Sequence, residues 1–274
     1  MSKNNKASEQ VLLATMNGSP ARIGESEVWR VPCHSELGSR PLIVKLLTLR
    51  KLLIEVLCAV TGRRIGLPIP RPYLVLLEPE SLAPNSPISR TLAFGSEEEP
   101  YPAVSSLIRE PAVVELLLRR WEHAKEAAAF DTWIANEDRT TKNLLLGQHL
   151  WLIDHDDAIP DWASADSDTA NKILDVISDG LSEFNRHKLI RDVRNATAGY
   201  NAVNLDDLKL PFSLSVLERG PEQMKLLTDF LTDRISSVLA LISARVNPRQ
   251  AELLDDNRNT SSSKSRTDNG PAGV

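Results

Sequence analysis

Cysteine is scarce in this chain: only Cys33 and Cys58 occur among 274 residues. They fit neither a disulfide framework nor a zinc-binding pattern, which favours a reducing compartment. The chain also lacks any apolar run that approaches the roughly 18 residues of a membrane span, and its first ten residues are polar. We therefore predict a cytoplasmic protein that does not act at a membrane.

Positive charge is also limited, with 32 Lys and Arg residues against 37 Asp and Glu residues and a formal net charge of −5. This balance argues against a broad basic surface for nucleic acid. It leaves room for a local basic pocket that binds an anionic nucleotide. The length suits one large domain or two lobes, and the 42% hydrophobic content is ordinary for a globular protein.

The most informative stretch is FDTWIANEDRTTKNLLLGQHLWLIDHDDAI, residues 130–159. Asp138 is followed five residues later by Asn143, which is the spacing of a phosphotransferase catalytic loop. In such loops the Asp orients the accepting hydroxyl and the Asn holds magnesium. Two short apolar runs then lead to Asp154. Each residue alone also fits ordinary turn or N-cap chemistry, but the three together favour a site.

The two apolar runs predict a β-hairpin with strands at Leu144–Leu146 and 150–153 and a turn at 147–149. If the turn centres on its last two residues, Asn143 and Asp154 lie opposite each other. Directly paired residues have Cβ atoms about 4.5–5.5 Å apart, close enough to share one cation. A turn centred one residue earlier offsets them by two positions and still leaves them neighbours.

Apolar periodicity and turn residues predict the elements around this stretch. Strands are expected at 11–16, 27–31, 41–47, 73–77 and 90–94, and helices at 49–60, 112–134, 169–182, 183–198 and 223–245. The predicted fold class is α+β, with a small β-rich first lobe, a larger mainly helical second lobe and a nucleotide cleft between them.

The domain organisation follows from the same patterns. We expect a flexible N-terminus at 1–10, the first lobe at 11–95, a linker at 96–111, the helical lobe with catalytic loop and hairpin at 112–254, and a disordered tail at 255–274. The tail lacks apolar periodicity and is rich in Ser, Asn, Asp and Gly.

The motif N-x-D-R-x-x-K-N-L-L followed by L-W-L-I-D-H resembles the HipA-like kinases, which belong with the phosphatidylinositol kinases to the wider protein-kinase-like fold. The first lobe agrees, with V-K-L-L around Lys45, I-E-V-L-C-A-V around Glu55, and then I-G-L-P-I-P-R-P. The resemblance covers residues 11–158 and implies that ATP and Mg²⁺ are used. Members are often toxins of toxin–antitoxin pairs, so the resemblance also makes an antitoxin-type protein partner a candidate.

By this resemblance Lys45 would contact the α- and β-phosphates of ATP, and Glu55 would hold Lys45 by an ion pair. A lone Lys inside an apolar strand is costly unless an anion meets it, which supports the role independently. Two alternatives remain open. Lys45 could reach solvent from an edge strand, and Glu55 could pair with Lys51, four residues earlier, on a helix surface.

The resemblance places Gly18 in the turn that covers the phosphates, although only Gly18 and Gly24 occur in this segment. That does not make a full glycine-rich loop, and an ordinary hairpin turn is the alternative. Phe94 belongs to a segment, residues 92–95, that resembles the part linking the lobes and meeting adenine through its backbone.

In the larger lobe the resemblance makes Asp138 the catalytic residue, with Asn143 and Asp154 as the magnesium ligands. Hard oxygen ligands in small number suit Mg²⁺. Lys142 would neutralise the transferring phosphate, or else be a solvated loop residue. Asn136 is expected to brace the loop through side-chain hydrogen bonds.

The chain departs from the family pattern at two places. Relatives usually carry a His near Asp138, where this chain has Thr140. A degenerate kinase, which has the fold but reduced or no activity, therefore stays an alternative. Relatives also favour D-H-G after the metal-binding Asp, whereas here His155 is followed by Asp156 and Asp157. An added carboxylate would support a second metal or face solvent, and His155 is expected to be structural.

The leading hypothesis is an ATP- and Mg²⁺-dependent phosphotransferase that moves the γ-phosphoryl of ATP to a hydroxyl of a protein Ser or Thr, or of a small molecule. The alternative is a nucleotide-binding pseudokinase or interaction module without turnover. A metal-dependent hydrolase built on Asp154, Asp156 and Asp157 ranks last, because clustered His ligands are lacking. A lipid acceptor is disfavoured because no basic or amphipathic membrane-docking segment stands out.

Overall fold

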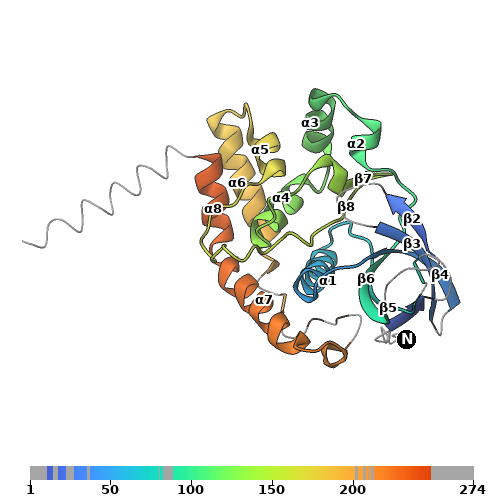
Figure 1. The fold of residues 1–274 in the computed structure, drawn as a ribbon. Helices are drawn as coiled ribbons and strands as arrows, with labels where there is room; N and C mark the ends of the chain where they lie inside the picture. Colours follow the sequence, from blue (N-terminus) through green and yellow to red (C-terminus); the bar gives the residue numbers. More distant parts are fainter. Residues whose placement is uncertain are drawn as a thin grey trace, which may run out of the picture.

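The computed structural model describes residues 11–14, 18–22, 28–35, 38–79, 81–82, 89–200, 203–205, 208, 210 and 213–247. The expected flexible N-terminus at 1–10 and the expected tail at 255–274 lie outside these residues. The strands gather on the right of Figure 1 and most helices on the left, with helix α1 between them. The predicted α+β class is confirmed.

The strands form one sheet that closes on itself. They are β1 (Val11–Ala14), β2 (Ser19–Arg22), β3 (Val28–Ser35), β4 (Gly38–Lys45), β5 (Pro72–Leu77) and β6 (Thr91–Glu97). Their order is β1-β5-β6-β4-β3-β2, and β3 also pairs with β1. Five strands therefore make a closed barrel, while β2 continues along β3. The sequence predicted most of the strands but not β2 or this closure.

The barrel has its own buried apolar cluster, contributed almost entirely by the strands: Leu12, Ala14, Val31, Cys33, Leu42, Val44, Tyr73, Val75, Leu77, Leu82 and Ala93. Gly95 of β6 lies beside this cluster. A Cβ atom there would lie 2.6 Å from Val75 Cγ2 and 3.3 Å from Leu42 Cδ1. The missing side chain therefore lets β6 lie close to its neighbours in the barrel.

Eight α-helices are present in the described part of the chain. They are α1 (Leu49–Arg64), α2 (Val104–Leu107), α3 (Pro111–Arg120), α4 (Ala124–Trp133), α5 (Lys172–Ser178), α6 (Glu183–Thr197), α7 (Gly220–Ile235) and α8 (Val238–Val246). In the described ranges, no helix combines the length and apolarity that a membrane crossing requires.

Two of the predicted helices are each broken in two. The helix expected at 112–134 is α3 and α4, because the backbone at Trp121 turns to an extended conformation (φ −68°, ψ 126°). The helix expected at 223–245 is α7 and α8, which meet at Ser236 and Ser237. The apolar periodicity continues across both breaks since the halves bury residues in the same core, so periodicity alone could not reveal them.

Trp133, at the end of α4, joins three parts of the helical core. Its side chain is fully buried, and Nε1 donates a hydrogen bond to the Leu231 carbonyl of α7 at 2.8 Å. Its ring stacks on Tyr200, with ring centroids 4.7 Å apart. α4 is therefore held firmly where it leads into the predicted catalytic loop.

A buried ion pair ties that loop to α4. Arg139 donates from Nε to Asp131 Oδ2 at 3.1 Å and from Nη2 to Oδ1 at 2.9 Å, and both side chains are at most 1% exposed. Arg139 Nη1 also donates to the carbonyls of Ile153, at 2.7 Å, and Asn143, at 3.4 Å. One guanidinium thus holds the end of a helix and two points on the hairpin.

Asn136 braces the same loop, as predicted. Its Oδ1 accepts a hydrogen bond from the backbone N–H of Asp138 at 3.1 Å, and its Nδ2 donates to Asp131 Oδ1 at 3.2 Å. The backbone position of Asp138 is therefore coupled to the buried Asp131–Arg139 pair.

We predict that Trp133→Ala lowers the free energy of unfolding by about 3–5 kcal/mol, because it leaves a large cavity and removes the hydrogen bond to Leu231. Urea unfolding followed by circular dichroism measures this. Trp162→Ala is the control, since Trp162 is 60% exposed and its loss should change stability by no more than about 0.5 kcal/mol. Similar losses in the two variants would contradict the described packing.

We also predict that Arg139→Met lowers the free energy of unfolding by about 3–5 kcal/mol, because Asp131 would remain buried without its cation. The same urea titration applies. Arg219→Met is the control: Arg219 pairs with Glu222 across 3.3 Å, but both side chains are more than 60% exposed, and exposed pairs contribute about 0–1 kcal/mol. A loss below about 1 kcal/mol for Arg139→Met would argue against its anchoring role.

Candidate functional site

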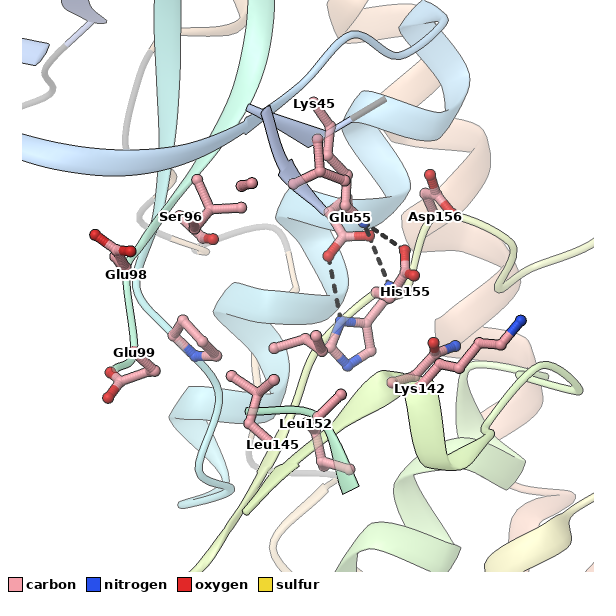
Figure 2. A pocket seen from close by; sticks show the side chains of 18 of the residues that line it. Lys45, Glu55, Ser96, Glu98, Glu99, Lys142, Leu145, Leu152, His155 and Asp156 are labelled. Carbon is pink, nitrogen blue, oxygen red and sulfur yellow. Dashed lines mark hydrogen bonds and ion pairs between the residues drawn. The ribbon is translucent and has the colours of Figure 1, made fainter. Parts of the chain in front are cut away.

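A cavity of about 940 Å³ opens between the barrel, α1 and the predicted catalytic loop, and Figure 2 shows it from close by. Seven of the eight residues predicted for the site line it: Lys45, Glu55, Phe94, Asp138, Lys142, Asn143 and Asp154. Gly18 does not belong to the lining, whereas its neighbours Ser19 and Pro20 do. The Gly18 backbone N–H instead donates to the Ser81 carbonyl at 2.7 Å.

Lys45 lies at the end of β4, a strand paired on both sides by β3 and β6. The alternative of an edge-strand lysine is therefore wrong. Its side chain is buried and makes ion pairs with Asp154 Oδ1 and, at 3.7 Å, with Glu55 Oε2. Burial by itself would lower the pKa of Lys45, but Glu55 and then Asp154 outweigh it and raise that pKa. Lys45 is thus a cation at neutral pH.

Glu55 projects from α1 and is 3% exposed. Its Oε2 accepts a hydrogen bond from the backbone N–H of His155 at 2.6 Å. Burial would raise the pKa of Glu55, yet the Lys45 charge and the contacts with His155 lower it below its usual value. Lys51 pairs with Asp157 instead, at 2.6 Å. The alternative of a surface pair between Glu55 and Lys51 is therefore wrong.

His155 is packed inside the protein beneath Glu55, as Figure 2 shows. Its Nδ1 lies 3.5 Å from Glu55 Oε1, and its ring meets the edge of Phe130 with centroids 6.0 Å apart. Burial lowers the pKa of His155, so the ring is neutral at pH 7. These contacts fit the structural role expected of it, because they fix Glu55 relative to the segment that carries Asp154.

The predicted catalytic loop is held by its own hydrogen bonds. Asn143 Nδ2 donates to the Asp138 carbonyl at 2.7 Å and to Asp138 Oδ2 at 3.2 Å. The amide oxygen of Asn143 therefore points away from Asp138. Thr140 accepts from the Lys142 N–H at 3.3 Å and caps the short 3-10 turn Thr141–Asn143. Thr140 thus shapes this turn.

The hairpin forms as predicted, but its register differs. β7 (Leu144–Leu146) and β8 (Leu150–Leu152) pair with Leu144 opposite Leu152. The turn is thus three residues centred on Gln148, and the Ile153 N–H donates to the Asn143 carbonyl at 3.1 Å. Asn143 therefore lies opposite Ile153, one residue before Asp154, and the expected direct pairing of Asn143 with Asp154 is wrong. Asp154 then adopts a left-handed backbone, with φ 65°.

The residues beside Asp154 differ sharply in their surroundings. Asp156 is 5% exposed, and its Oδ2 has no hydrogen-bond partner in the described residues. Burial raises the pKa of Asp156 to about 6, although Lys45 acts in the opposite direction. One oxygen each of Glu55, Asp154 and Asp156 lies within 4.8 Å of the others. Asp157 is exposed and outside this group, which weakens the hydrolase set of Asp154, Asp156 and Asp157.

The available donors suit a hard divalent cation. Asp154 and Asp156 offer carboxylate oxygens and Asn143 an amide oxygen, the ligand types that Mg²⁺ prefers. The unpartnered Asp156 Oδ2 is consistent with a cation at this position.

Sequence reasoning missed the buried Asp131–Arg139 pair and the burial of Asp156. A signal existed for the pair, since both are charged residues in a stretch that otherwise reads as core.

The acidic run Glu97, Glu98 and Glu99 also lines the cavity, and Glu98 there pairs with Arg30 at 2.6 Å. Nothing in the local sequence indicated that these three glutamates would line the cavity.

Comparison with known proteins adds independent evidence. A search of the solved structures finds the Helicobacter pylori proinflammatory kinase CtkA, with a TM-score of 0.51 and 10% sequence identity, covering 86% of this chain and 98% of that one. At this identity the similarity concerns the fold alone. A search of curated proteins finds no match.

The family comparison is more direct. A sequence model of the HipA-like kinases matches residues 33–203, which is more than half of the chain. The matched region contains Lys45, Glu55, the predicted catalytic loop and the hairpin. The chain therefore belongs to the HipA-like kinase family.

Proposed function

We propose that this chain is an ATP- and Mg²⁺-dependent phosphotransferase that moves the γ-phosphoryl of ATP to a hydroxyl, with a protein Ser or Thr as the first acceptor to test. The observation that carries the proposal is the buried Lys45, charged and paired with Glu55 and Asp154, in the same cavity as Asp138 and Asn143. A buried cation that lines a cavity suits the binding of a phosphate.

In this proposal each residue has one task. Lys45 meets the α- and β-phosphates, and Glu55 keeps it aimed into the cavity. Asn143 and Asp154 would hold Mg²⁺, which when bound neutralises charge on the phosphates. Asp138 accepts a hydrogen bond from the acceptor hydroxyl and orients it, and Lys142, which is exposed at the cavity, offsets charge on the transferring group.

For adenine the structure suggests a refinement. The backbone of Phe94 pairs with Lys45 of β4 on one side and with Leu74 of β5 on the other. We therefore propose that Phe94 contacts adenine with its side chain. The segment that follows β6 also lines the cavity, through Glu98, Glu99, Tyr101 and Pro102, and in this proposal its backbone meets the polar edge of the base.

We further propose that the fold is two-lobed and protein-kinase-like, with lobes at 11–95 and 112–254 and a linker at 96–111. The barrel with α1 and the predominantly helical remainder support this division. A cytoplasmic location and an antitoxin-type protein partner remain proposals that rest on the sequence and on the family.

A pseudokinase is the second candidate, because Thr140 caps a turn and cannot supply the proton-transfer group that a His would. Such a protein would bind ATP with Mg²⁺ without transferring phosphate.

We predict that Asp138→Asn lowers phosphate transfer by about 10²–10⁴-fold, because the acceptor hydroxyl loses its orienting carboxylate. Radiolabelled ATP with Mg²⁺ measures autophosphorylation and phosphate release. Glu137→Gln is the control, since Glu137 accepts from the Ala170 N–H at 2.9 Å through an oxygen that Gln retains. Equal signals from wild type and Asp138→Asn would remove Asp138 from its catalytic role.

We predict that Lys45→Met abolishes the rise in melting temperature that ATP with Mg²⁺ produces in the wild type, because the phosphates lose their buried cation. Lys51→Met is the control, since Lys51 is half-exposed and pairs with Asp157 on the surface. An unchanged ATP-induced shift in Lys45→Met would contradict the nucleotide site. A full shift in the wild type without label transfer would favour the pseudokinase.

A further inference from the structure

The cavity carries more negative charge than its cations balance. Eight carboxylates line it: Glu55, Glu97, Glu98, Glu99, Asp138, Asp154, Asp156 and Asp157. The lining cations are Arg30, Lys45 and Lys142, which leaves five more carboxylates than cations. A polyanionic nucleotide entering this cavity would be repelled unless further cations came with it or were already present.

Asp156 is the carboxylate whose position most needs a cation. Its side chain is almost fully buried, lines the cavity, and has an oxygen, Oδ2, without a hydrogen-bond partner in the described residues. A buried carboxylate in this condition is costly unless a charge or a donor meets it. Lys45, the nearby cation, makes its ion pairs with Asp154 and Glu55 instead.

The neighbouring oxygens are close to the spacing that a metal ion requires. One oxygen each of Glu55, Asp154 and Asp156 lies within 4.8 Å of the others. Oxygens that share an octahedral Mg²⁺ lie about 3.0–4.2 Å apart, so small side-chain movements would close the site. Glu55 already accepts from the His155 N–H, which leaves Asp154 and Asp156 as the principal pair.

We propose that Asp156 is a divalent-cation ligand which, with Asp154, binds one cation before the nucleotide arrives. This position is additional to the one assigned to Asn143 and Asp154. The inference rests on the proposed function for the purpose of the cation, which is to prepare an acidic cavity for a polyanion.

The test is Mn²⁺ binding without nucleotide, measured by electron paramagnetic resonance of free Mn²⁺ during a titration. Wild type should bind Mn²⁺, Asp156→Asn should bind it at least tenfold more weakly, and Asp157→Asn should match the wild type. Asp157 is the matched control because it is adjacent, acidic and exposed, and pairs with Lys51. Equal affinity in wild type and Asp156→Asn, or no binding by the wild type, would overturn the proposal.

Thermal unfolding gives a second readout and checks folding. In EDTA, Asp156→Asn should melt no lower than the wild type, because a buried unpaired charge has been removed. Mn²⁺ should raise the melting temperature of wild type and Asp157→Asn but not that of Asp156→Asn. If Asp156→Asn does not fold, Asp156→Ser takes its place with the same expectation. An equal rise in all the proteins would reject Asp156 as a ligand.

The outcomes for the two proposals are separable. Loss of Mn²⁺ binding in Asp156→Asn, together with a wild type that transfers no phosphate, would support the cation site and contradict the phosphotransferase. Unchanged Mn²⁺ binding in Asp156→Asn, together with active wild type, would contradict the cation site alone.

Discussion

The fork that Arg139 makes around Asp131 is the interaction on which the site depends. Arg139 directly follows Asp138, and its third nitrogen binds the carbonyls of Asn143 and Ile153. Asp138, Asn143 and Asp154 are therefore each held by Arg139 directly or lie next to a residue that it holds. A buried pair gains little net stability after desolvation, so its main effect is to fix geometry. The planar fork of Arg suits this task better than Lys would.

The sequence predicted the local elements of the site well and their exact relation less well. Apolar runs located β7 and β8, and a lone Lys in an apolar strand indicated the buried Lys45. The hairpin register was missed because residues 147–149 allow turns of different length. Gly147 lies under the ring of Tyr101, where a Cβ would be 2.6 Å from a ring carbon. That contact comes from a distant segment and cannot be read from the hairpin itself.

The remaining differences also arise from distant contacts. The barrel closes because β1 pairs with β3. Asp156 is buried beside α1, where Glu55 accepts a hydrogen bond from the backbone N–H of the preceding residue, His155. Local periodicity carries no information about such contacts, nor about the breaks within the two long predicted helices. By contrast, the sequence indicated which charged group would be buried with partners, as for Lys45, because a charge inside an apolar run is unusual without a partner.

The barrel leaves β2 with a free side, since β2 ends the strand order and pairs only with β3 in the described sheet. An open strand edge can recruit a strand from another molecule and start aggregation. Pro20 lies in β2, opposite Trp29, and has no N–H to donate. Because Ser19, Pro20 and Ala21 of β2 line the cavity, the cavity is bordered by a strand edge that is a poor template for association with another molecule.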